Sequence, residues 1–453
     1  MKRDVDSLRS CLEGVVPSLM ATCAPDGTPN LAYLSQVQYV DADHVALSFQ
    51  FFNKTRQNVL ANPRATLVVV DPDTSASYRL AVRYLRTETA GPLFESMKAK
   101  LAGIASHTGM AGVFALRGSD VYRVEAIEAV PGNYRPPPPP RCSTMPALRR
   151  TAQRLARCRD LDGFLEATLA ALAAEFGIDH AMVLLLDRPG ERLYTVASHG
   201  YPASGVGSEI PLGQGVIGVA AREATPIRIA HLTSEYAYAR TVRESAATQG
   251  LSALLETEIP LPGLAAAHSQ LAVPIVAFGT TLGVLFVESP QEMRFSYDDE
   301  DALVGVAAHL GMAIQGLQAA EGAEETAAGD GARVAGGADP QAGPPCVVRH
   351  FASDCSVFLD DDYLIKGVAG AIFWTLVSDF VSRQRSAYTN RELRLDPRIR
   401  LPDISDNLEA RLILLERRLV ERNACVRIVK TGRGRFRLEV TRPLQLVGVP
   451  ATG

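Results

Sequence analysis

The stretch Val426-Arg-Ile-Val-Lys-Thr-Gly-Arg-Gly-Arg-Phe-Arg-Leu-Glu-Val440 alternates apolar and cationic residues around a centre that contains two glycines. Alternation places the apolar side chains on one face of a strand, and the glycines permit a reversal, so the stretch predicts a β-hairpin with a cationic outer face. Before it, residues 406–422 repeat leucine at three- and four-residue spacing, which predicts an amphipathic helix. A helix beside a cationic hairpin is an arrangement that suits a DNA groove.

Cations are concentrated in this part of the chain. Residues 383–442 hold sixteen Lys or Arg against eight Asp or Glu, a balance of +8, whereas the whole chain has a formal charge of −4. A basic region of this kind favours contact with nucleic acid. The alternative is a solvated helix with surface salt bridges, which is what a run of charges usually means.

The segment resembles the winged-helix effector domain of response regulators. The resemblance implies a first helix over residues 363–381, a second helix that begins at Asn390, and a recognition helix over residues 406–422. It implies double-stranded DNA as the partner, with side chains on the exposed helix face and on the hairpin divided between base edges and phosphates. The residues expected to make these contacts are Asn407, Arg411, Arg418, Lys430, Arg433 and Arg435.

Length and composition bound the rest of the molecule. A chain of 453 residues with 47% hydrophobic and 21% charged residues predicts about three globular domains. The N-terminus lacks the apolar core of a signal peptide, and the sequence predicts no membrane span, so a cytoplasmic location is expected. Seven scattered cysteines without a Cys-x-x-Cys pair argue against a disulfide framework and against a metal site.

Two changes in composition divide the chain. The polyproline stretch at residues 135–141 predicts a stiff spacer, and residues 319–345 have almost no large apolar side chain, which predicts a disordered linker. The expected organisation is therefore a first domain over 1–134, a linker over 135–146, a second domain over 147–318, a linker over 319–345 and a third domain over 346–445.

The first domain alternates short apolar strands with turns. Strands are expected over residues 17–23, 29–39, 44–49 and 65–70, with a short helix that ends at Pro63, and this succession predicts a small antiparallel barrel.

The domain resembles the FMN-binding split barrel of the pyridoxamine phosphate oxidase-like proteins. The resemblance rests on Asp26-Gly-x-Pro29, on Lys54-Thr-Arg-Gln-Asn58 with Asn62-Pro-Arg64, and on a closing strand over residues 120–128. It implies FMN as cofactor and a homodimer, with the phosphate held by a cation, a hydroxyl and helix amides. The residues expected at the flavin are Ser35, Gln36, Gln50, Lys54, Thr55, Arg56 and Asn58. A barrel that has lost its flavin is the alternative.

No catalytic residue is expected in this domain. The polyproline linker begins where the family's substrate-binding segment would continue, and His44 and His107 are isolated histidines. Enzymatic turnover is therefore not the preferred interpretation.

The second domain mixes helices and strands. A helix is expected over residues 147–176, strands over 181–187, 193–198, 270–276 and 281–288, and a closing helix over 298–315, which predicts an α+β domain. With Pro211-Leu-Gly-Gln-Gly-Val-Ile-Gly218, this order resembles a GAF domain. The resemblance leaves the class of small-molecule ligand open. Residues 232–262 are expected to cover the pocket.

The predicted fold is therefore multidomain: an antiparallel split β-barrel, an α+β GAF domain and a C-terminal α+β winged helix. The predicted function is a ligand- or redox-responsive transcriptional regulator in which the second domain transmits the signal and its terminal helices join a dimer interface. The alternatives are an FMN-dependent oxidoreductase and a non-catalytic scaffold whose winged helix binds protein.

Overall fold

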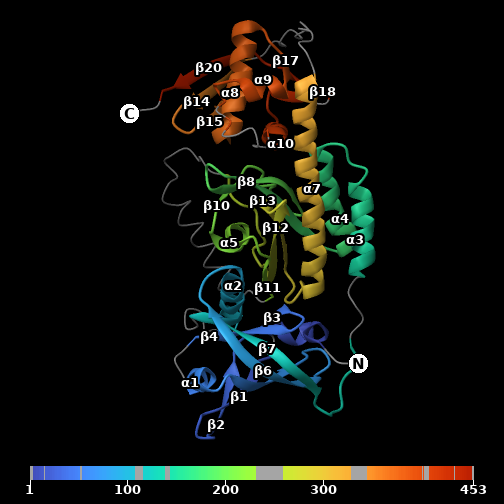
Figure 1. The fold of residues 1–453 in the computed structure, drawn as a ribbon. Coiled ribbons are helices and arrows are strands. Elements are labelled where there is room, and N and C mark those ends of the chain that lie inside the picture. Colours follow the sequence, from blue (N-terminus) through green and yellow to red (C-terminus); the bar gives the residue numbers. More distant parts are fainter. Residues whose placement is uncertain are drawn as a thin grey trace.

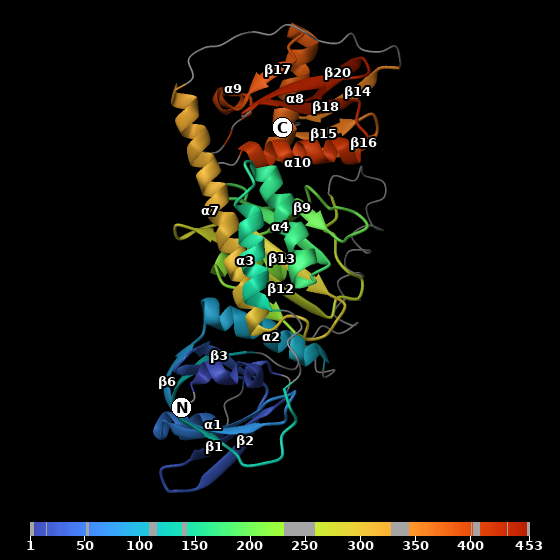
Figure 2. The ribbon, with the colours of Figure 1, turned by 90° about the vertical axis from the view of Figure 1, so that its right-hand side faces the viewer.

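The computed structural model describes residues 4–14, 16–50, 54–107, 116–137, 143–230, 259–327, 344–399, 401, 408–432 and 434–450. Three domains follow one another along the molecule in the order of the sequence: an N-terminal domain, a middle domain and a C-terminal domain (Figure 1). One long helix, α7 (Tyr297–Ala327), runs beside the middle domain from the N-terminal domain towards the C-terminal domain (Figure 2).

The N-terminal domain is a seven-stranded antiparallel sheet with the order β2-β1-β5-β6-β7-β4-β3. Buried and less buried residues alternate along its strands, and the buried ones form the core: in β5, Ala65, Leu67 and Val69 are buried on one face. The strand expected over residues 29–39 is in fact two strands on opposite edges of the sheet, and Ser35 and Gln36 lie in the break. The elements are η1 (Val5–Leu12), β1 (Ser18–Cys23), β2 (Pro29–Leu34), β3 (Val37–Asp41), β4 (His44–Phe49), α1 (Lys54–Ala61), β5 (Arg64–Val70), β6 (Ser77–Glu88), α2 (Pro92–His107) and β7 (Gly118–Ala129).

The middle domain is a six-stranded antiparallel sheet with the order β10-β9-β8-β13-β12-β11. The helix expected over residues 147–176 is two helices, because the Asp160 carboxylate accepts a hydrogen bond from the Gly163 amide at 2.8 Å and starts a new helix there. The elements before α7 are α3 (Thr144–Leu155), α4 (Leu161–Phe176), β8 (His180–Asp187), β9 (Arg192–His199), β10 (Glu209–Pro211), α5 (Gly215–Glu223), β11 (Ile227–Ile229), β12 (Ser269–Ala277) and β13 (Thr280–Ser289).

The two faces of the middle sheet have separate cores. Helices α3, α4 and α7 cover one face, where Leu165, Val183 and Leu303 belong to a large apolar cluster. Helix α5 covers the other face, where Met182, Ile217 and Phe286 form a smaller cluster. Helices on both faces explain why β8 and β12 are almost continuously apolar.

In its described residues the C-terminal domain has two sheets and three helices. A four-stranded sheet has the order β16-β15-β14-β20, in which β14 and β20 are parallel, and a three-stranded sheet has the order β17-β19-β18. The elements are β14 (Cys346–Phe351), β15 (Ser356–Leu359), β16 (Asp362–Ile365), α8 (Gly367–Arg383), β17 (Ala387–Thr389), α9 (Asn390–Leu395), α10 (Leu408–Glu421), β18 (Val426–Gly432), β19 (Arg435–Val440) and β20 (Leu444–Val449).

Several expected boundaries are wrong in this domain. The four-stranded sheet was not predicted, and its strand β16 occupies the start of the helix expected over residues 363–381. Strand β20 extends the domain beyond residue 445 because it pairs with β14 along its whole length. At the other end, α7 continues through residues 319–327, where a disordered linker was expected.

Helix α7 also departs from the expectation that the chain has no apolar run long enough to span a membrane. Its segment Tyr297–Ala319 is the one helical stretch among the described residues that is long and apolar enough to cross a membrane by length and composition. Six of its apolar side chains are buried within the domain, on the face that packs against the sheet and the neighbouring helices. They are Ala302, Leu303, Val306, Ala307, Leu310 and Ile314.

Candidate functional site

The residues predicted to line the flavin ring lie at two adjacent strand ends of the N-terminal domain. Ser35 and Gln36 separate β2 from β3, and Gln50 follows β4 directly. The structure brings them together, because the Gln50 amide nitrogen donates to the Ser35 hydroxyl at 3.1 Å. Gln36 donates to Gln38 at 3.2 Å, and Gln38 donates to Ser96 of α2 at 3.3 Å. A row of amide side chains therefore lies at one end of the sheet.

Two atoms of this row are buried without a hydrogen bond. The amide oxygens Oε1 of Gln36 and of Gln50 have no partner among the described residues. A buried acceptor that no protein group satisfies costs free energy, on the order of 1–3 kcal/mol, and a ligand donor removes that cost. These acceptors suit the ring N–H of an isoalloxazine, which is what the predicted cofactor would offer.

Helix α1 carries the residues predicted at the flavin phosphate. Thr55 and Asn58 are buried and point to the strands β1 and β2: the Thr55 hydroxyl accepts from Asn30 at 2.9 Å, and Asn58 donates to Thr22 at 3.1 Å. Lys54, at the start of the helix, is exposed. The cation of this cluster that faces solvent is therefore Lys54.

Arg56 is engaged in a different contact. Its guanidinium bonds both carboxylate oxygens of Asp120 on β7, donates to Thr87 at 2.8 Å and lies 4.3 Å from the centroid of the Phe49 ring. The side chains of Arg56 and Asp120 are largely buried. This ion pair ties α1 to β7 and leaves the guanidinium neutralised, so a phosphate would have to compete with Asp120 for it.

The expected exposed face of the recognition helix is wrong at two positions of α10. Arg411 is 5% exposed and Arg418 is 3% exposed. The Arg411 guanidinium lies 3.9 Å from the centroid of the Tyr194 ring in the middle domain and 3.3 Å from the Asp187 carboxylate. Arg418 donates to the backbone oxygen of Leu364 at 3.1 Å within its own domain. Two arginines predicted to face DNA therefore contact protein in this arrangement.

A third arginine of the helix joins the same interface. Arg417 donates to the Asp162 carboxylate at 2.7 Å and to the backbone oxygen of Val196 at 3.0 Å, both in the middle domain. The sequence did not indicate this contact, because a single sequence carries no signal for contacts between domains. Of the other residues predicted to contact DNA, Asn407 and Arg433 lie outside the described residues.

The hairpin β18–β19 keeps its cations in solvent. Val426, Ile428 and Phe436 are buried on one face, whereas Arg435 and Arg437 are exposed on the other. Lys430 is exposed too, but it pairs with Phe436 and therefore lies at the end of the apolar face. The predicted alternation of the hairpin is therefore observed up to its end, with Val426 opposite Val440 and Ile428 opposite Leu438.

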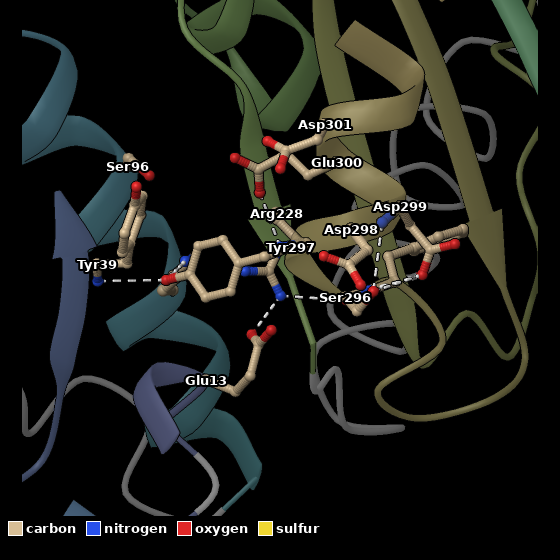
Figure 3. A network of polar contacts seen from close by, with 12 residues as sticks. Glu13, Tyr39, Ser96, Arg228, Ser296, Tyr297, Asp298, Asp299, Glu300 and Asp301 are labelled. Atoms are coloured by element: carbon tan, nitrogen blue, oxygen red, sulfur yellow. Dashed lines mark hydrogen bonds and ion pairs between the residues drawn. The ribbon is translucent and has the colours of Figure 1, made fainter. Parts of the chain in front are cut away.

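A polar network that the sequence did not indicate joins the N-terminal and middle domains (Figure 3). Arg228 of β11 is 1% exposed, bonds the Glu13 carboxylate from the N-terminal domain, and donates to Glu300 of α7 at 2.8 Å. Tyr297, the first residue of α7, places its hydroxyl 3.4 Å from the Tyr39 amide and 3.3 Å from the Lys100 ammonium. Two domains are thus connected by buried charges.

Lys100 lies at the edge of this network. Burial and the nearby Arg228 lower its pKa from 10.5 to about 8, and Glu300 and Glu13 offset only part of that shift. Burial and the Glu13 carboxylate raise the pKa of the Tyr297 phenol, so this hydroxyl stays protonated and donates to the Leu12 backbone oxygen at 3.4 Å.

Two distant cysteines meet in the C-terminal domain. Cys425 precedes β18, and its backbone oxygen accepts from Thr441 at 2.8 Å, whereas the Cys346 amide donates to Pro443 at 2.8 Å. The thiols are hydrogen bonded to each other, and this contact with burial raises the pKa of Cys346. Both remain free thiols. Among the described residues, no group of three or more His, Cys, Asp or Glu side chains could hold a metal ion.

Comparison with known proteins identifies two of the three domains. Residues 5–126 match the family model of pyridoxamine 5'-phosphate oxidase, and residues 158–315 match the model of the GAF domain. The chain therefore contains a pyridoxamine phosphate oxidase-like N-terminal domain and a GAF domain, which confirms these two resemblances.

Individual relatives are more distant. An uncharacterized protein of Methanocaldococcus jannaschii is 31% identical over 90 residues, which cover 18% of this chain and 60% of that protein, so the chain spans less than two thirds of its length. The GAF domain of an Acinetobacter phosphoenolpyruvate-protein phosphotransferase has 24% identity and a TM-score of 0.31, with 39% of this chain and 94% of that chain covered. An FMN-binding protein of Syntrophomonas wolfei has 16% identity and a TM-score of 0.24, with 28% and 86% covered.

Proposed function

We propose that this chain is a ligand- or redox-responsive transcriptional regulator. In this proposal the N-terminal domain binds FMN, the GAF domain binds a small molecule, and the C-terminal domain binds double-stranded DNA as a winged helix. The observation that carries the proposal is the exposed cationic face of the hairpin β18–β19, which follows α8, β17, α9 and α10 in the order that a winged helix requires.

The hairpin is suited to the phosphate backbone. Arg427, Lys430, Arg435 and Arg437 are exposed, and the apolar side chains between them hold the hairpin on the domain core. Each phosphate that such a cation neutralises releases counterions, which makes affinity fall as salt rises. Arg437 is already paired with Glu439, so the other three cations contribute most.

Sequence recognition would come from α10. An arginine fork that reads a guanine edge must be free of other partners. Since Arg411 is held by Tyr194 and Asp187, the observed arrangement supports DNA contact through the hairpin with little base readout.

The test is a titration of promoter DNA with the full-length protein at several salt concentrations, with fluorescence anisotropy of the labelled DNA as the readout. Affinity that falls steeply with salt supports the regulator. Absence of binding at low salt, from protein with a folded circular dichroism spectrum, removes the DNA-binding function and leaves the scaffold in which the C-terminal domain binds protein. The burial of α10 against the GAF domain is the observation that favours that scaffold.

Flavin binding rests on the amide row and on α1. The unpartnered oxygens of Gln36 and Gln50 supply acceptors for the ring, and Lys54 with the α1 amides supplies a phosphate site. The absorbance spectrum of the purified protein tests this directly, because bound flavin absorbs in the visible region. Protein that neither carries flavin nor takes it up contradicts the assignment.

A homodimer would form on the edge strand β2. Leu31 and Tyr33 of this strand are 66% and 78% exposed, next to α1 and its exposed Leu60. An exposed apolar edge strand favours association. Light scattering tests it, and a monomer at high concentration contradicts it.

A further inference from the structure

The loop between β9 and β10, residues 200–208, lies between two parts of the molecule that the sequence keeps far apart. On one side it meets residues 259–262 of the GAF domain, and on the other it meets α10 of the C-terminal domain. A Cβ built on Gly207 would lie 2.7 Å from Ile259 Cδ1, 3.7 Å from Leu414 Cδ1 and 3.8 Å from Arg418 Cδ. A side chain at position 207 would thus meet both partners.

The loop is held firmly against its own sheet. The Gly207 amide donates to Thr195 at 2.9 Å, and the Thr195 amide donates to Ser208 at 2.9 Å. The hydroxyls of Thr195 and Ser208 are hydrogen bonded to each other at 2.8 Å in a buried position. These bonds fix the loop relative to β9, so its contacts with residues 259–262 and with α10 are held at a set separation.

Residues 259–262 lie against the α5 face of the GAF sheet. Leu261 packs against the apolar cluster that contains Met182, Ile217 and Phe286. Pro262 is in tight contact with the loop, since a Cβ on Gly205 would lie 2.0 Å from its Cδ. Leu261 and Pro262 therefore connect the apolar cluster on the α5 face to the loop.

The other side of the loop restrains α10. The Ser204 hydroxyl donates to Glu421 at 3.0 Å, and Glu421 accepts from Arg418 at 2.6 Å. Val206 belongs to the same buried apolar cluster as Leu414 and Leu415, so the cores of the two domains are continuous here. The arginine contacts of α10 with Asp162, Asp187 and Tyr194 flank this apolar contact.

We infer that the β9–β10 loop holds α10 in an inhibited position and releases it when residues 259–262 are displaced. This inference rests on the proposed DNA-binding function for its biological meaning, but the release of α10 is measurable without DNA. In the docked state Arg411 and Arg417 are occupied by the GAF domain, and in the released state they are available to a groove.

The test uses the full-length protein and the variant Gly207→Ala. The new Cβ would lie 2.7 Å from Ile259 Cδ1 and in ordinary contact with Leu414 and Arg418, so it is the Ile259 side chain that has to shift. Because displacement of residues 259–262 is the inferred trigger, we expect α10 to undock and its amide hydrogens over residues 408–421 to exchange about tenfold faster. The matched control is Gly279→Ala in the β12–β13 turn of the same sheet. Gly279 also has a positive φ, +72° against +91° for Gly207, but a Cβ there meets no atom within 4 Å. The control variant has the backbone strain without the close contact, so the amide exchange of α10 should stay as in the wild type.

Two further variants keep the test decisive. Ser204→Ala removes the hydrogen bonds of this hydroxyl to Glu421 and from the Val206 amide without backbone strain, and it tests the inference if Gly207→Ala does not fold. Asp162→Asn weakens the Arg417 contact from the GAF side and leaves the α10 sequence intact, so it shows that release is detectable. Faster exchange in Asp162→Asn, with wild-type exchange in folded Gly207→Ala or in Ser204→Ala, would overturn the role of the loop.

DNA titrations of the same proteins separate the two proposals. Released variants that bind promoter DNA about tenfold more tightly than the wild type support both. Release of α10 without DNA binding at low salt leaves the coupling in place and removes the regulator. Equal DNA affinity for docked and released proteins keeps DNA binding and overturns the inhibition.

Discussion

The guanidinium carbon of Arg228 lies 4.1 Å from the centroid of the Tyr297 ring, and both side chains are buried where the N-terminal domain meets the GAF domain (Figure 3). Arg228 comes from β11 and Tyr297 begins α7, so the stacked pair joins a strand and a helix of one domain. The carboxylate of Glu13 reaches the same guanidinium from the other domain. Replacing any of these groups therefore changes an interface rather than a single core.

Arg228→Met should destabilise the full-length protein by about 3 kcal/mol, because it leaves the Glu13 and Glu300 carboxylates without their cation in a largely buried site. Urea unfolding measures the change. The control is Arg79→Met in the N-terminal domain, whose side chain is 58% exposed and whose partner Glu128 is 70% exposed. An exposed pair of this kind contributes less than about 1 kcal/mol. Equal effects of the two variants would contradict the role of burial.

The stability of this interface should rise with pH above 8. The folded-state pKa of Lys100, about 8, lies below its ordinary value of 10.5, so the folded protein binds fewer protons than the unfolded chain between these values. The contribution of Lys100 is present above pH 10.5 and is lost as pH falls through about 8. We therefore expect Lys100→Met to be more stable than the wild type at pH 7, with a difference that shrinks towards pH 10. Parallel stability curves across this range would exclude the shift.

The two cations of α1 should behave differently towards flavin. Lys54→Ala should weaken FMN binding about tenfold, because it removes a charged partner of the phosphate, and it should leave riboflavin binding unchanged. Arg56→Ala should lower the melting temperature of the domain instead, since Asp120 and Thr87 lose their partner. Fluorescence titrations with both flavins, together with thermal unfolding, separate these effects. Unaltered FMN affinity in Lys54→Ala would move the phosphate site elsewhere.

The hairpin should control the salt dependence of DNA binding. Lys430→Ala with Arg435→Ala should weaken binding to all sequences and reduce the slope of log affinity against log salt by roughly 0.9 for each phosphate that the variant no longer neutralises. Arg79→Ala with Arg83→Ala on β6 removes two cations from the N-terminal domain and serves as the control. A slope that falls equally in both double variants would point to general charge rather than to the hairpin.

Local periodicity predicted most elements of this molecule correctly. The hairpin of residues 426–440 follows from alternation and turn residues. Four strands of the GAF sheet, β8, β9, β12 and β13, follow from apolar runs bounded by turn residues, within a few positions of their observed limits. The break of the entry helix at Asp160 was missed although an N-cap residue marked it. The sheet of β14, β15, β16 and β20 was missed because its two ends are nearly a hundred residues apart.

The sites were harder to predict than the fold. Arg411 and Arg56 were assigned to ligands because exposed cations are the usual partners of phosphate, yet each pairs with a carboxylate far away in the sequence, Asp187 and Asp120. Arg228 was not singled out, because a lone arginine within a short strand gives no sign of burial. Contacts between domains depend on surface shape, which a single sequence does not encode in any local pattern.

Helix α7 is long enough to connect the N-terminal domain with the C-terminal domain. At 1.5 Å per residue, its 31 residues form a rod of about 46 Å. The phenol of its first residue, Tyr297, is set among atoms of the N-terminal domain, and the rod passes the whole GAF domain before it ends near the C-terminal domain (Figure 2). With this length, a tilt of about 5° at the tyrosine displaces the far end by about 4 Å. A small change in the orientation of α7 at the N-terminal domain, too small to alter that domain's fold, would thereby move the other end of the helix, beside the C-terminal domain, by about the length of a side chain.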